Sequence, residues 1–63
     1  MPYKIKEARL EMNMTQEELA EKSGISRATI SALENGKVEI TTTDTLVKLA
    51  KALNRRVSDI FLA

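Results

Sequence analysis

The segment that decides the fold spans residues 15–37 and reads TQEELAEKSGISRATISALENGK. It opens with Thr15 and Glu18 at the spacing of a capping box, in which each side chain satisfies the other residue's free backbone amide. Gly24 follows the first helical stretch, and glycine readily adopts the positive φ that a tight turn needs. Ser26 then favours the start of a second helix. The segment therefore predicts two short helices joined by a tight turn.

The small and apolar residues of this segment stand where two such helices would cross. Ala20 is small enough to let the helices approach closely, and Gly24 follows it by four residues. The apolar contacts that would lock the helices together come from Leu19, Ile25, Ile30 and Leu33. The pair Asn35-Gly36 is a strong stop signal for the second helix. This pattern indicates a helix-turn-helix, although any helical hairpin with a glycine turn would share it.

The second helix of the pair has an outward face free of acids. No acidic residue occurs from Lys22 to Leu33, although nine of the 63 residues are acidic. The residues expected to face outward are small or cationic: Ser26, Arg27, Ala28, Ser31 and Ala32. Such a face can enter the major groove of DNA, which is about 12 Å wide, or it can be a weakly polar surface without a role. The acids of the preceding helix, Glu17, Glu18 and Glu21, are expected to point to solvent or toward the N-terminal helix.

Helical spacing of apolar residues continues through the rest of the chain, with no alternating strand pattern. One helix is expected from about Lys4 to Met12, and Asn13 suits a left-handed residue just past its end. A fourth helix is expected to start at a Thr42 cap within the threonines of Thr41–Thr43. Its apolar stripe consists of Leu46, Leu49, Ala50 and Leu53, and Asn54 ends it.

A short last helix is expected over about Val57 to Phe61, with Phe61 in the core beside Val57 and Ile60. Before it, Arg55 must lay its stem over the core or turn outward, because the guanidinium stays hydrated. Arg56 offers no good side-chain cap. These two cations and the lysines at 48 and 51 could touch DNA, but a solvated face is favoured. Leu10 stands where exposed polar residues are common. The apolar C-terminal tail either folds over its own core or forms part of a subunit contact, for which Leu62 is the better candidate.

Length and composition restrict the function further. Sixty-three residues suffice for one domain, taken as residues 1–63. The absence of cysteine and histidine excludes a disulfide, a thiolate metal site and the usual general base, so no metal, cofactor or enzymatic activity is expected. The net charge of +1 says little by itself. No apolar stretch approaches the roughly 20 residues of a membrane span, and the N-terminus lacks a signal-peptide pattern, so a cytoplasmic location is expected.

The elements TQEELA, GISRATIS and LENGK follow one another in register, and this run resembles the Cro/CI-type (XRE) helix-turn-helix family, which includes the lambda phage repressor. The resemblance extends over nearly the whole chain. It implies an all-α, compact, lambda-repressor-like domain of five helices, with the helix-turn-helix at helices two and three. It also implies that the third helix is the recognition helix for double-stranded DNA.

By position, the resemblance implies roles for individual residues. Gln16 would contact a phosphate and brace the recognition helix. Positions near the sugar-phosphate backbone are matched by Thr15, Asn35 and Lys37. Base-facing positions are matched by Arg27, Ala28 and Ala32, with Ser26 and Ser31 nearby. Arg9 and Glu34 match a pair that joins helix one to the end of helix three, and we predict that salt bridge here; the alternative is two independent surface charges.

The chemistry of these residue types agrees with the implied roles. The free amides at the starts of helices two and three can bind phosphate. Arg27 can hydrogen-bond bidentately to guanine, or it can contact a phosphate and add affinity without sequence preference. Ala28 and Ala32 offer only a methyl group, suited to thymine or to close backbone approach.

These features predict a sequence-specific regulator of transcription. A repressor that binds paired half-sites as a homodimer is the simplest form, with recognition helices about 34 Å apart. No small-molecule ligand or membrane contact is indicated. The alternative from another class is an antitoxin-type protein-interaction module that also binds its own promoter. An enzyme would need a carboxylate pair or an activated serine, and neither Asp44 nor Asp59 stands in such a setting.

Overall fold

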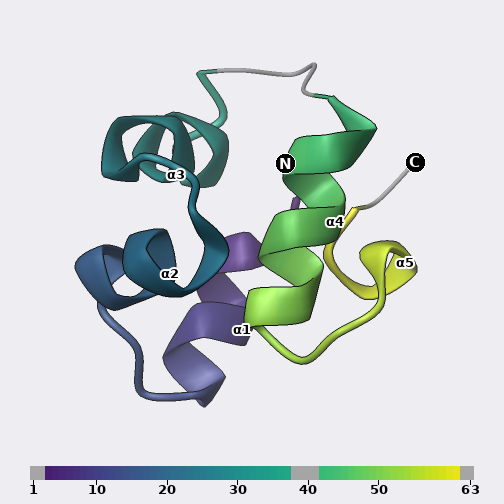
Figure 1. The fold of residues 1–63 in the computed structure, drawn as a ribbon, viewed down its shortest axis with the longest axis horizontal. Helices are drawn as coiled ribbons and strands as arrows, with labels where there is room; N and C mark the ends of the chain where they lie inside the picture. The colour runs from purple at the N-terminus through teal and green to yellow at the C-terminus, as the bar shows by residue number, and fades with distance from the viewer. Residues whose placement is uncertain (1–2, 38–41, 62–63) are drawn as a thin grey trace.

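The computed structural model describes residues 3–37 and 42–61, and within these ranges it consists of five helices without a strand (Figure 1). The helices are α1 (Ile5–Glu11), α2 (Gln16–Ser23), α3 (Arg27–Glu34), α4 (Thr43–Ala52) and α5 (Val57–Ile60). The all-α class and the five predicted helices are confirmed, with bounds that differ from the expected ones by about a residue. Leu62 and Thr41 lie outside the described residues.

Three helices begin at a side-chain cap that the sequence predicted. Thr15 accepts a hydrogen bond from the backbone N–H of Glu18 (3.0 Å), and the Thr15 N–H donates to the Glu18 carboxylate (2.9 Å), which completes the capping box. Ser26 and Thr42 each accept from the N–H three residues on, at 3.2 and 3.1 Å. α5 has no side-chain cap bond from Arg56, as expected, although the Arg56 N–H donates to the Asp59 carboxylate (3.0 Å).

Left-handed residues end α2 and the turns after α1 and α4. Gly24 has φ +77°, and Asn13 and Asn54 each have φ +55°. A Cβ built on Gly24 would meet no atom within 4 Å. Glycine is therefore favoured at this turn by its backbone conformation and not by lack of space.

A single, mainly aliphatic core joins all five helices. Its largest fully buried side chains are Ile5, Leu19, Ile30, Leu33, Leu49, Leu53 and Ile60. α4 packs against α2 and α5, while α3 packs against α1 and α2. In Figure 1, α2 and α3 therefore lie on one side of α4 and α5 lies on the other. The inward stripes predicted for α3 and α4 are confirmed, and the core leaves α3 at the edge of the molecule.

The prediction that Phe61 completes the core is wrong. Phe61 is 38% exposed, whereas Tyr3 is only 5% exposed. The chain leaves α5 in an extended conformation at Phe61 (φ −116°, ψ 120°), so this side chain no longer shares the helical face of Ile60. Tyr3 and Phe61 instead form an antiparallel bridge, with ring centroids 5.4 Å apart. Phe61 thus covers Tyr3 from outside, and Tyr3 takes the interior place.

Candidate nucleic-acid interface

The third helix presents two contrasting faces. Ile30 and Leu33 are fully buried, while Arg27 and Ala28 on the first turn are exposed. Ser31 and the alanine at 32 are half-buried, so the expected outward face is confirmed only in its first turn. The residues one turn further along lie at the border between the inner and outer faces. The outer surface of α3 is therefore small and rests mainly on its N-terminal end.

The first turn of α3 is the more electropositive of the two helix starts in the helix-turn-helix. It contains no acidic residue, and the Ser26 hydroxyl accepts from the Thr29 N–H while it donates to the Thr29 hydroxyl (2.9 Å). The first turn of α2 contains Glu17 and Glu18, which already oppose the positive end of its dipole. The first turn of α3 therefore contributes no carboxylate of its own that would repel a phosphate, whereas the first turn of α2 contributes two.

The far end of α3 is tied to α1 by a buried ion pair. The Arg9 Nε and Nη2 atoms donate to the two carboxylate oxygens of Glu34 at 2.9 and 3.0 Å, and each residue is only 8% exposed. Arg9 Nη1 donates to the carbonyl oxygen of Met14 (2.8 Å). The hydrogen bond to Glu34 raises the pKa of Arg9, against the lowering effect of burial. The predicted salt bridge is confirmed, and the alternative of two independent surface charges is wrong.

Gln16 joins the same ion pair from α2. Its Nε2 donates to Glu34 Oε1 at 3.1 Å, so α1, α2 and α3 converge on one carboxylate. A primary amide has two N–H donors, and this bond uses one of them. The bracing expected of Gln16 thus has a defined partner, while its contact with a phosphate stays a prediction.

The remaining candidate residues lie at the start of α2 and beyond the end of α3. Thr15 is exposed at the start of α2, where its hydroxyl serves the capping box. Asn35 and Lys37 are exposed beyond the end of α3; Asn35 Nδ2 donates to the Ser31 hydroxyl (3.2 Å), and the Lys37 N–H donates to the Ala32 carbonyl (2.9 Å). Their contacts with a nucleic-acid backbone stay predictions.

One contact beside this surface was not predicted from the sequence. Glu17 faces solvent, as expected, and its Oε1 also lies 3.4 Å from Arg27 Nη1 on α3. Both side chains remain largely exposed, at 77% for Glu17 and 63% for Arg27. Helical periodicity carries no signal for this contact, because it depends on how α2 and α3 cross.

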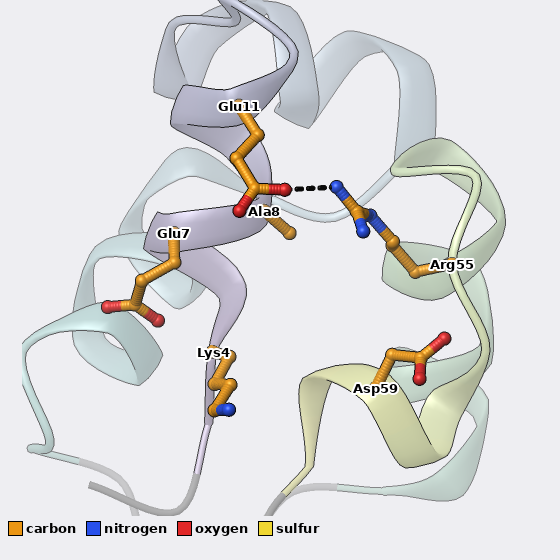
Figure 2. Close-up of a pocket in the computed structure, with 6 residues that line it drawn as sticks. All are labelled: Lys4, Glu7, Ala8, Glu11, Arg55 and Asp59. Carbon is orange, nitrogen blue, oxygen red and sulfur yellow. Dashed lines mark hydrogen bonds and ion pairs between the residues drawn. The ribbon is translucent and has the colours of Figure 1, made fainter.

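Two cations of the basic C-terminal half, Arg55 and Lys48, form ion pairs within the molecule. Figure 2 shows a cleft between α1 and the region of α5, in which Arg55 extends toward Glu11 and forms an ion pair with it. Lys48 pairs with Asp44 one turn back on α4 (3.1 Å). Arg55 thus lies in the cleft with its side chain 37% exposed, between the two arrangements expected for it, and the solvated face expected of these cations stays a prediction.

The helical pair, its cap and its exposed second helix define a helix-turn-helix protein. A helix-turn-helix family model matches residues 5–60, and the chain belongs to this family, of the XRE type. Members of the family bind DNA and are not enzymes. Among residues 3–37 and 42–61, the structure has no helix long and apolar enough to cross a membrane.

Curated relatives cover almost all of the chain. A protein of Archaeoglobus fulgidus is 44% identical over 62 residues, which make up 98% of this chain and 86% of the relative. A protein of Methanocaldococcus jannaschii is 42% identical over 62 residues, 98% of this chain and 92% of its own length. A protein of Bacillus subtilis is 33% identical over 61 residues, 97% of this chain and 91% of the relative. Each is named an uncharacterized HTH-type transcriptional regulator.

Proposed function

We propose that the chain is a sequence-specific transcriptional regulator that places the outer face of α3 in the major groove of double-stranded DNA. The observation that carries the proposal is the exposed first turn of α3, which contains no acidic residue. The C-terminal end of the same helix is held by the buried Arg9–Glu34 ion pair. A helix that is rigidly attached to its scaffold and exposed at its N-terminal end matches the way recognition helices dock. The names of the relatives support a role in transcription.

Within this proposal, the exposed residues divide by what they would contact. Arg27 reads a base, while Ala28 and Ala32 approach thymine methyl groups or the backbone. Gln16, through its second amide N–H, contacts a phosphate near the start of α2. Thr15, Asn35 and Lys37 extend the phosphate contacts on either side, with Ser26 and Ser31 close to the groove.

We further propose that the protein acts as a homodimer of the Cro/CI type and represses transcription by covering a promoter. One copy of α3 offers a single long side chain, Arg27, on its exposed first turn, so one half-site carries little sequence information. Two copies related by a twofold axis would read half-sites about 34 Å apart. Repression by occlusion requires only that the dimer binds tightly to the promoter.

Selection of bound duplexes from a random pool tests this function. We expect an enriched sequence with two related half-sites one helical turn apart, and an affinity that falls steeply as salt is added. Sedimentation at micromolar concentration should show a dimer, free or on the selected duplex. Titrations that stay flat even at low ionic strength would overturn DNA binding. A strict monomer, both free and on DNA, would overturn only the dimer.

A further inference from the structure

We propose that Glu17 is a positioning residue for Arg27, which holds the guanidinium so that its guanine-reading edge faces outward. This inference rests on the proposed function, because it concerns how Arg27 reads DNA. It assigns a role in sequence discrimination to an acidic residue of α2, outside the recognition helix.

The contact with Glu17 uses only one of the three guanidinium nitrogens of Arg27. Glu17 Oε1 lies 3.4 Å from Arg27 Nη1, and no other hydrogen bond engages this guanidinium in the part of the chain that the structure describes. The Nε and Nη2 atoms therefore keep their N–H groups free. These two groups point the same way and form a fork that matches two neighbouring acceptors, such as O6 and N7 of guanine.

The guanidinium of Arg9 divides its donors between two partners in the same way. Its Nη1 donates to the Met14 carbonyl (2.8 Å), and its Nε and Nη2 bind the two oxygens of Glu34. One partner on Nη1 thus leaves the Nε–Nη2 edge open for a second, bidentate partner. At Arg27 the first partner is Glu17, and the second place is open to solvent, because the side chain is 63% exposed.

The Glu17 carboxylate has a second effect on DNA binding. Glu17 and Arg27 line the same open groove as Gln16, the residue proposed to contact a phosphate. A negative charge there repels phosphates on every sequence, so it lowers the affinity for specific and non-specific DNA alike. This repulsion changes affinity without changing base preference, so only the positioning of Arg27 alters the ratio of specific to non-specific binding.

The test compares variants that remove one negative charge from α2. Glu17→Ala removes the partner of Arg27, and Glu17→Gln removes the charge but keeps an acceptor for Nη1. Glu21→Ala is the matched control, because Glu21 is exposed on the same helix and its carboxylate has no hydrogen bond or ion pair among residues 3–37 and 42–61. Dissociation constants are measured on the selected duplex, on the duplex changed at the base that Arg27 reads, and on random DNA.

We expect Glu21→Ala to raise affinity for all three duplexes by a similar factor and to leave base discrimination unchanged. Glu17→Ala should reduce discrimination at the Arg27 position by roughly two- to fivefold, the scale of an exposed ion pair. Glu17→Gln should retain part of it. Identical behaviour of Glu17→Ala and Glu21→Ala, with the wild type binding specifically, would overturn the positioning role alone. A wild type that binds no duplex would overturn the proposed function itself.

Discussion

Two arginine–glutamate pairs stand at opposite ends of α3 and differ in almost every physical respect. At the C-terminal end, Arg9 and Glu34 share two short hydrogen bonds, and each is only 8% exposed. At the N-terminal end, Arg27 and Glu17 share one contact of 3.4 Å, and both are largely exposed. The same two residue types therefore serve to anchor the helix at one end and stay available to a ligand at the other.

This contrast shows how one helix can be fixed rigidly at its C-terminal end and remain available for recognition at its N-terminal end. A buried charge without its partner is strongly destabilising, so the Arg9–Glu34 pair fixes the place of α3. An exposed pair contributes little to stability, so Arg27 can bind a ligand through its free Nε–Nη2 edge at little cost. The hydrogen bond from Gln16 to Glu34 links the anchored end to the start of α2.

The largest effect should come from breaking the buried pair. Glu34→Ala leaves the Arg9 guanidinium buried without its carboxylate, and we expect the free energy of unfolding to fall by about 3 kcal/mol. For a domain of this size the melting temperature should fall by roughly 12–24 °C. Urea denaturation followed by circular dichroism measures the change.

A double variant separates the buried charge from loss of packing. Arg9→Met combined with Glu34→Leu replaces both charges by apolar side chains of similar volume, and it should recover a large part of the loss. Equal instability of the single and double variants would contradict the view that an unpaired buried charge is the cause.

The opposite pattern is expected at the exposed end. Arg27→Ala should change the free energy of unfolding by less than about 0.5 kcal/mol, since an exposed pair contributes little. Discrimination at one base in each half-site should fall by about 1–3 kcal/mol. Binding titrations on selected and singly altered duplexes measure this loss. A uniform loss on all sequences would reduce Arg27 to a phosphate contact.

Gln16 tests the link between the anchored end and the DNA surface. Gln16→Ala removes the hydrogen bond to Glu34 and should lower the free energy of unfolding by about 1 kcal/mol. The proposed phosphate contact would be lost on every sequence, so affinity should fall without a change in base preference. A change in base preference would instead show that Gln16 acts through the placement of α3. Thermal unfolding and duplex titrations give the two values.

The smallest effect on stability is expected from Glu17. Glu17→Gln should alter the free energy of unfolding by less than about 0.5 kcal/mol, and the difference should vanish in high salt. Urea denaturation at two salt concentrations measures it. A salt-independent loss of more than 1 kcal/mol would show that this pair is a second anchor, and the contrast between the two ends of α3 would disappear.

Local chemistry made much of this arrangement predictable from the sequence. The Thr15–Glu18 capping box, the Ser26 cap and the left-handed Gly24 depend on residues close together in the chain, and all three are confirmed. The Arg9–Glu34 pair, 25 residues apart, was predictable only because the sequence resembles a known family.

Features that depend on tertiary geometry were not predictable in this way. The Glu17–Arg27 contact requires the crossing of α2 and α3, which periodicity does not specify. Phe61 was misplaced because helical spacing was extended one residue beyond the end of α5. The Glu11–Arg55 pair joins residues 44 positions apart, and neither residue has a local partner that would indicate it.

We propose, above all, that the exposed N-terminal end of α3 contacts the DNA duplex. Isotope-labelled protein can be titrated with the selected duplex while the chemical shifts of its backbone amides are recorded. The residues whose shifts change identify the surface that contacts the DNA. We expect the largest shifts at Arg27, Ala28 and the start of α2, with small shifts in α5. Shifts concentrated on α4 and α5, or no shifts with any duplex at low salt, would contradict this proposal.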